Sequence, residues 1–260
     1  MQASTIHPSA VVSPDARLGQ GVHIGPYSVI DGDVEIGDGT EIRNNVYIAD
    51  GARIGNECRI YSGAVIATEP QDLKFAGESS LAIIGDRTVI RECATVNRGT
   101  SASGRSIVGR DCLIMAYCHV AHDCVLGDNV IMANSTQLAG HVTIHDWAIL
   151  GGGTLVHQFC NVGKHAMIGA GTYVSKDICH YLLAEGNDLQ LHGINRIGLR
   201  RRGFEAGVMK EIEEFYRTIF HSGLNVSAGV AAYQERGAAI PEIQECIDFI
   251  RASKRGIYRG

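Results

Sequence analysis

Aliphatic residues recur at every sixth position over most of the chain. The series runs from Ile6 to Val174, and its exceptions are Asp72, Glu78 and Ala102. A second series, two residues before each of these positions, holds mostly small residues. Neither an α-helix nor an alternating hairpin produces a sustained period of six. The pattern predicts short strands joined by turns, with three hexapeptides in each triangular coil and the aliphatic series pointing inward. We therefore expect a mainly β chain, with a left-handed parallel β-helix of hexapeptide repeats over residues 1–185.

Two segments interrupt the repeat without changing its register. They are residues 67–83 and residues 97–107. Insertions of this kind form loops that leave one face of the solenoid, and loops on a rigid scaffold often carry binding groups. The second insertion is also consistent with a plain Gly/Ser loop.

Beyond Gly186 the pattern changes to helical spacing. Apolar residues within 208–219 lie at i, i+4, i+7 and i+11, and Pro241 opens another segment with one apolar side. These features predict an α-helical C-terminal domain over residues 186–260. Such a domain would cover the open end of the β-helix, whose strand edges would otherwise be unpaired.

Charge and composition narrow the classes of partner. The net charge is −5, with acidic and basic residues spread along the chain, so nothing attracts nucleic acid or an anionic membrane as a whole. The first residues lack the pattern of a secretory signal, and no segment approaches the roughly 18 apolar residues of a transmembrane helix. We expect a cytoplasmic protein with no transmembrane segment and no nucleic-acid partner.

The eight cysteines include no C-x-x-C pair and no zinc-knuckle spacing. Five of them fall in the small-residue series, where we expect them to be buried wall residues. Neither a disulfide framework nor a structural metal is predicted.

Histidines offer the clearest chemistry, because six of the eleven lie between residues 119 and 165. With 18 residues in a coil, His122, Gly140 and Gln158 should stack at the strand spacing of about 4.8 Å. An imidazole beside an unshielded backbone N–H suits acyl transfer, with the ring as general base and the N–H as oxyanion donor. Asp123 could orient the ring, provided that a turn brings both side chains to one side.

Other interpretations of these residues stay open. Each histidine, taken singly, is compatible with an ordinary surface role. Three imidazoles, from His119, His122 and His141, could instead bind zinc, as in β-helical carbonic anhydrases. The basic cluster at Arg196 and residues 200–202 could receive a diphosphate or an acidic protein, or could be a solvated face.

Several motifs resemble those of the acyl-[acyl-carrier-protein]–UDP-N-acetylglucosamine O-acyltransferase family, over essentially the whole chain. They are QDLKFAGE at 71–78, NRGT at 97–100, AHDC at 121–124, LAGHV at 138–142, VHQFC at 156–160 and LRRRGF at 199–204. The resemblance implies the first step of lipid A biosynthesis, carried out by a homotrimer with active sites between subunits. It implies that His122 deprotonates the sugar 3-hydroxyl, with Asp123 as its partner and Gly140 as the oxyanion donor.

The resemblance also implies roles in substrate binding. Residues expected to hold the amino sugar are Asp72, Lys74, His141 and His157, and those expected near the nucleotide and phosphates are His119, Gln158, Asn195, Arg201 and Arg202. The family's acyl donor is a 3-hydroxyacyl thioester on the phosphopantetheine of acyl carrier protein, an acidic partner that Lys164 and residues 200–202 could attract. No other cofactor and no metal are implied.

Two aspects of specificity follow from the same resemblance. The site corresponding to Ala170 helps to set acyl length in the family, and the methyl group of alanine predicts a shorter chain than glycine would allow. Some members use a 3-amino analogue of the sugar, so N-acyl transfer stays an alternative. A later N-acyltransferase of the pathway normally carries an extra N-terminal domain, whereas here the repeats begin at residue 6. A purely structural ice-binding solenoid would need a more regular polar face.

Overall fold

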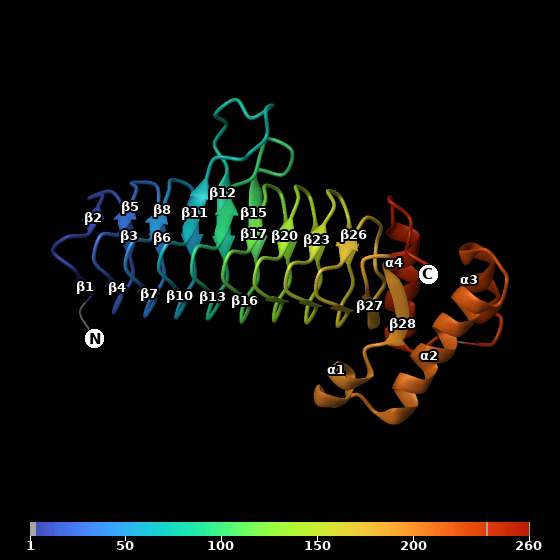
Figure 1. Ribbon diagram of the computed structural model, residues 1–260. Coiled ribbons are helices and arrows are strands. Elements are labelled where there is room, and N and C mark those ends of the chain that lie inside the picture. Colours follow the sequence, from blue (N-terminus) through green and yellow to red (C-terminus); the bar gives the residue numbers. More distant parts are fainter. Residues whose placement is uncertain (1–3, 238, 260) are drawn as a thin grey trace.

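The computed structural model describes residues 4–237 and 239–259, which form a long prism of short strands with helices at one end (Figure 1). The strands make three sheets, called here the first, second and third faces. The first face contains, in spatial order, β1 (Thr5–Ile6), β4 (His23–Ile24), β7 (Glu41–Ile42), β10 (Arg59–Ile60), β13 (Val89–Ile90), β16 (Leu113–Ile114), β19 (Ile131–Met132), β22 (Ile149–Leu150), β25 (Met167–Ile168), β27 (Leu182–Glu185) and β28 (Gln190–Ile194).

The other two faces are parallel throughout. The second face contains β2 (Val11–Val12), β5 (Val29–Ile30), β8 (Tyr47–Ile48), β11 (Val65–Thr68), β14 (Thr95–Asn97), β17 (His119–Val120), β20 (Gln137–Leu138), β23 (Leu155–Val156) and β26 (Tyr173–Val174). The third face contains β3 (Arg17–Leu18), β6 (Glu35–Ile36), β9 (Ala52–Ile54), β12 (Leu81–Ile84), β15 (Arg105–Val108), β18 (Val125–Leu126), β21 (Thr143–Ile144) and β24 (Asn161–Val162). Three successive strands complete one coil, so the predicted β-helix is confirmed.

The turns between faces form three edges of the prism. We call the edge between the first and second faces the first corner, that between the second and third faces the second corner, and that between the third and first faces the third corner. Each strand pairs with the strand one coil later, as Val120 pairs with Leu138. Equivalent turns are therefore stacked along each corner.

The two inward series form the core. Every aliphatic position of the repeat from Ile24 to Val174 is buried. The five cysteines of the small-residue series are at most 2% exposed, and burial raises the pKa values of Cys112 and Cys118 to about 11. These thiols stay protonated, as expected of wall residues rather than nucleophiles. Ile6 is 47% exposed, because within the described residues a coil packs on only one side of it.

Both insertions leave the prism at the second corner. Ala82 of β12 pairs with Ala52 of β9, and Leu81 pairs with Arg105 of β15, so the extra residues separate paired strands without breaking the pairing. The resulting loops, residues 69–80 and residues 98–104, follow β11 and β14 and project side by side from the prism (Figure 1).

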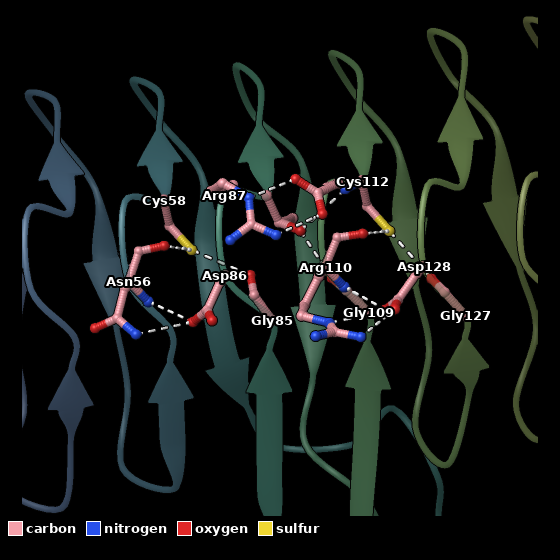
Figure 2. Close-up of polar contacts among 12 residues, drawn as sticks. Asn56, Cys58, Gly85, Asp86, Arg87, Gly109, Arg110, Cys112, Gly127 and Asp128 are labelled. Carbon is pink, nitrogen blue, oxygen red and sulfur yellow. Dashed lines mark hydrogen bonds and ion pairs between the residues drawn. The ribbon is translucent and has the colours of Figure 1, made fainter.

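The third corner shows how an ordinary turn of this fold satisfies its backbone (Figure 2). The N–H of Asn56 donates to Asp86 Oδ1 at 2.8 Å, and the N–H of Arg110 donates to Asp128 Oδ1 at 2.8 Å. In each case a carboxylate from the next coil caps the first residue of the turn. An otherwise orphaned donor thereby gains a partner.

Helices occupy the end of the chain, as predicted. They are α1 (Arg196–Arg201), α2 (Ala206–His221), α3 (Val226–Gln234) and α4 (Pro241–Ala252). The expected apolar side of α2 is buried at Ile212, Phe215 and Ile219. Beyond residue 186 the first face gains the antiparallel strand β28 before the helices begin. A domain division at residue 186 stays a prediction. Among the described residues, no helix has the length and apolarity needed to cross a membrane.

A matched pair of valines tests the inward series. Val108 is fully buried in β15, whereas Val125, in the neighbouring strand β18, is 39% exposed. We expect Val108→Ala to lower the free energy of unfolding by about 2 kcal/mol, through lost burial and a residual cavity. Val125→Ala should change it by less than about 0.5 kcal/mol. Equal losses in denaturant titrations of the two variants would contradict the assigned register.

Candidate active site

The second corner stacks the three residues that the repeat length places in one column. The N–H of His141 donates to the carbonyl of His122 at 3.0 Å, and the N–H of Phe159 donates to the carbonyl of Gly140 at 3.2 Å. His122, Gly140 and Gln158 are thus the first residues of successive turns, after β17, β20 and β23. Asp123, His141 and Phe159 are the second residues of the same turns.

His122 and Asp123 form a hydrogen-bonded pair. The ring Nδ1 lies 2.8 Å from Asp123 Oδ2. Asp123 has a φ of 59°, so the left-handed turn brings its carboxylate back toward the preceding ring. Adjacent residues of a strand would point apart, and the turn removes that objection. The Asp123 side chain is inaccessible to solvent, and that of His122 is 14% exposed.

The second insertion supplies further donors to this carboxylate. Thr100 donates its N–H to Asp123 Oδ1 at 3.1 Å and its hydroxyl to Oδ2 at 2.7 Å, and the Ser103 hydroxyl donates to Oδ1. Burial by itself would raise the pKa of Asp123, but hydrogen bonds from Ser103, His122 and Thr100 outweigh it and lower the pKa to about 2. Asp123 is therefore ionised near neutral pH. The loop 98–104 is part of the site rather than a plain connection.

Two properties distinguish Gly140: the space that its missing side chain leaves and its backbone N–H. A Cβ at this position would lie 2.5 Å from Cε1 and 2.7 Å from Nε2 of His122, so the ring occupies the space of a side chain. Within residues 4–237 and 239–259, the Gly140 N–H donates to no acceptor. The equivalent N–H groups of Asn56 and Arg110 at the third corner are capped by carboxylates. The site thus holds a free backbone donor beside an imidazole.

A groove of about 420 Å³ lies beside this pair on the second face. Its lining includes His119, Gln137, Leu155, His157, Gln158 and Tyr173. His119 Nδ1 lies 2.6 Å from the Thr95 hydroxyl, and burial, followed by the neighbouring His122, lowers the pKa of His119. A neutral His119 can donate or accept a hydrogen bond in the groove without adding charge.

His141 closes the other side of the pair. Its ring stacks on Phe159 at 4.5 Å between centroids and meets the His122 ring edge-on at 5.1 Å. His141 Nε2 lies 3.8 Å from Asp123 Oδ2. Potential metal-binding atoms of His122, Asp123 and His141 lie within 4.8 Å of one another, whereas His119 is outside this group in the described chain. Because Asp123 Oδ2 already accepts bonds from His122 and Thr100, these donors fit a hydrogen-bonded pair better than a metal site.

Other expected site residues lie elsewhere in the chain. Asp72 and Lys74 are on the projecting loop 69–80, where Asp72 Oδ1 accepts the Lys74 N–H at 3.0 Å. Ala170 is an exposed turn residue at the first corner, between β25 and β26. No hydrogen bond or ion pair joins these three residues to His122 or Asp123 within the described ranges.

The third corner carries the last group. Asn195 caps α1 by accepting the Gly198 N–H at 3.0 Å, and its amide donates to the His165 carbonyl at 3.0 Å. Arg202 lies over the Trp147 ring at 5.2 Å, while Arg201 is exposed at the end of α1. Burial and the charge of Arg202 lower the pKa of His165 to about 4, so His165 is neutral beside the Arg202 guanidinium near neutral pH. Within one chain, Asn195, Arg201 and Arg202 therefore lie at a different corner from His122.

Comparison with known proteins identifies the family of the chain. A family model for bacterial transferase hexapeptide repeats matches residues 33–68 and 105–140, and a model described as Udp N-acetylglucosamine O-acyltransferase, domain 2, matches residues 177–258. The chain is 49% identical to the acyl-[acyl-carrier-protein]–UDP-N-acetylglucosamine O-acyltransferase of Thiobacillus denitrificans, over 98% of this chain and 100% of the relative. The chain belongs to the UDP-N-acetylglucosamine O-acyltransferase family.

Further members of the family support the assignment. The acyl-[acyl-carrier-protein]–UDP-N-acetylglucosamine O-acyltransferase of Alkalilimnicola ehrlichii is 51% identical, over 98% of this chain and 99% of the relative. The crystal structure of a UDP-N-acetylglucosamine acyltransferase from Bacteroides fragilis superimposes with a TM-score of 0.96 at 48% identity, covering 98% of this chain and all of that one. The likeness therefore extends over the prism and the helices together.

Sequence patterns did not single out Thr100 and Ser103 of this acyltransferase. The NRGT motif contains Thr100, but its partner Asp123 is 23 positions later. Only the closure of loop 98–104 onto the second corner brings the two together. The sequence held only a weak signal for these residues. The second insertion keeps the register of the repeat, and it ends about one coil before His122.

Gly140→Ala tests the shared space at the second corner. We expect acyl transfer to fall at least about a hundredfold, because the new methyl group displaces the His122 ring and disturbs the oxyanion donor. The matched control is Gly207→Ala, since a Cβ at Gly207 would meet nothing within 4 Å. Initial rates and thermal unfolding of both variants should be compared. Near wild-type turnover in Gly140→Ala would rule out this position as part of the catalytic centre.

Proposed function

We propose that this acyltransferase moves a 3-hydroxyacyl group from acyl carrier protein to the 3-hydroxyl of UDP-N-acetylglucosamine, the first step of lipid A biosynthesis. The observation that carries the proposal is the His122–Asp123 pair beside the free N–H of Gly140. Full-length relatives named for this reaction support it.

The proposed chemistry begins with the tautomer of His122. Asp123 is an ionised acceptor, so the ring Nδ1 carries the proton and Nε2 keeps its lone pair. Nε2 removes the proton of the sugar 3-hydroxyl, and the oxygen attacks the thioester carbonyl carbon. The Gly140 N–H stabilises the oxyanion that forms. When the carbon–sulfur bond breaks, the thiolate takes that proton from Nε2 and leaves as the free thiol of the carrier protein, which returns His122 to its neutral form.

Side chains around the groove are assigned to the acceptor. His141 and His157 hold the amino sugar, while His119 and Gln158 lie toward the nucleotide. All four side chains belong to the second corner or to the face beside it. The reactive thioester belongs to the phosphopantetheine of the donor, so the residues proposed here need no resident cofactor.

A homotrimer with active sites between its chains would account for the positions of the other proposed site residues. Asp72 and Lys74 project on a loop, Asn195, Arg201 and Arg202 occupy the third corner, and Ala170 occupies the first corner. A single rigid prism cannot bring three corners together. In a closed ring of three copies, one chain's second corner can face another corner of its neighbour.

The donor is proposed to dock on positive charge near the helices. Lys164 is already paired with Glu245 at 2.9 Å, whereas Arg200 and Arg201 are exposed. The residues 200–202 are therefore the better contact for an acidic carrier protein. Ala170 stays the proposed determinant of acyl length.

Replacing the proposed base tests the reaction itself. Metal-stripped protein should transfer a 3-hydroxyacyl group from acyl carrier protein to UDP-N-acetylglucosamine, and His122→Ala should lower kcat by about a thousandfold. His192→Ala is the matched control, because His192 is an exposed residue of β28. Absence of transfer by the wild type, with activity on the 3-amino sugar, would redirect the proposal to N-acylation. Transfer only after zinc is restored would point to the metal alternative.

Mixed trimers test whether two chains share a site. His122→Ala and Arg202→Ala are each expected to be inactive, whereas co-expressed and co-purified mixtures should recover about a quarter of wild-type activity. With random assembly, each cleft has about one chance in four of receiving both intact halves. Parents mixed after purification, without exchange of subunits, are the control. Mixtures no more active than their parents would show that one chain holds the complete site.

A further inference from the structure

The loop 98–104 is held firmly against the catalytic corner. The N–H of Gly99 donates to the Leu81 carbonyl at 3.1 Å, and the Gly104 carbonyl accepts the Leu81 N–H at 2.9 Å, so β12 ties both ends of the loop. The N–H of Ser101 donates to Glu78 Oε1 at 2.9 Å, which links this loop to the loop 69–80. Thr100 is only 6% exposed. Its contacts with Asp123 are therefore part of a fixed arrangement.

These contacts occupy the whole Asp123 carboxylate. Oδ2 accepts from His122 Nδ1 and the Thr100 hydroxyl, and Oδ1 accepts from the Thr100 N–H and the Ser103 hydroxyl. A carboxylate has about four lone-pair positions, so its accepting capacity is filled. The orientation of the carboxylate is thereby set by three donors of the loop and one of the ring.

The orientation of the Asp123 carboxylate matters because a second imidazole, that of His141, lies close to it. Its Nε2 lies 3.8 Å from Asp123 Oδ2, the same oxygen that accepts from His122. Two imidazoles thus compete for one carboxylate, and a small rotation of Asp123 would exchange its partner. The Thr100 hydroxyl on Oδ2 and the Ser103 hydroxyl on Oδ1 oppose that rotation, because each would lose its bond.

We propose that Thr100 and Ser103 are positioning residues for this reaction, which hold Asp123 toward His122 and so keep the base with Nδ1 protonated and Nε2 free. The inference rests on the acyl transfer proposed above and adds two residues to its machinery. Neither residue touches a reacting atom. Both hydroxyls also have contacts within the loop, because Thr100 Oγ1 accepts the Ala102 N–H and Ser103 Oγ lies 2.8 Å from the Arg105 carbonyl oxygen. The tests below therefore separate positioning of Asp123 from loop structure.

Steady-state kinetics give the primary test. The double variant T100V/S103A keeps the Thr100 N–H and the side-chain volume but removes both hydroxyls. We expect kcat to fall by about ten- to a hundredfold, with the KM values of both substrates changed less than about twofold. Thr100→Ser, combined with native Ser103, should restore kcat to within about twofold. Ser101→Ala is the matched control in the same loop, since its backbone N–H keeps the bond to Glu78 and no hydrogen bond joins Ser101 to Asp123 among the described residues. A proportional rise in KM, or no change in kcat, would overturn the proposal.

A double-mutant cycle separates positioning from loop structure. In an Asp123→Ala background, the T100V/S103A change should cost less than about twofold in kcat, because its target is already gone. If T100V/S103A lowers kcat by the same factor in the wild type and in the Asp123→Ala variant, the hydroxyls act through the loop itself.

The tautomer of His122 gives a readout that does not need turnover. In protein labelled with nitrogen-15 at histidine, long-range proton–nitrogen correlation should show the Nδ1–H form in the wild type and a tautomer mixture in T100V/S103A. His122→Ala assigns the signal. An unchanged tautomer in the double variant would overturn the positioning role. A wild type that has the Nδ1–H form but transfers no acyl group would instead overturn the proposed function alone.

Discussion

Parallel pairing between successive coils is the constraint on which the rest of this structure depends. Each strand must lie in register with the strand of the next coil, so equivalent turns stack along three corners at the strand spacing. The aliphatic series then faces inward in every coil and forms one continuous core. The same rule admits the two insertions, because they leave at a turn and return to the pairing. A residue added within a strand would instead reverse every following side chain.

Turns of similar geometry have different roles at the second and third corners. At the third corner, carboxylates and amides of the next coil cap the turn N–H groups, and the corner is structural. At the second corner, the His122 ring fills the space of a side chain at Gly140, and among the described residues the Gly140 N–H donates to no acceptor. The proposed catalytic centre of this acyltransferase thus lies on an ordinary turn of its fold that lacks such a cap at Gly140 within the described residues. Little backbone change separates the two, which explains how a repetitive scaffold can hold a specific site.

The rigidity of the prism also explains why the other proposed site residues lie far from one another within one chain. Side chains at different corners cannot approach one another without breaking strand pairing, and α1 is fixed at the third corner by Asn195. A site that uses several corners must therefore be assembled from several copies. In the proposed trimer, the projecting loop 69–80 (Figure 1) and the exposed Arg200 and Arg201 would contact the neighbouring copy.

The sequence by itself determined the period, the coil length, the inward series and the column of His122, Gly140 and Gln158, because strand pairing converts spacing directly into position. It also indicated α2 and α4, through apolar spacing and Pro241. Only the tertiary structure decided that Asp123 faces His122, since this depends on a left-handed turn that many residue types can adopt. It alone showed Thr100 at Asp123, because loop closure is set by contacts distant in sequence. Periodicity predicts the positions that repeat, whereas the contacts of an inserted loop and the direction of a side chain within a turn depend on the folded chain.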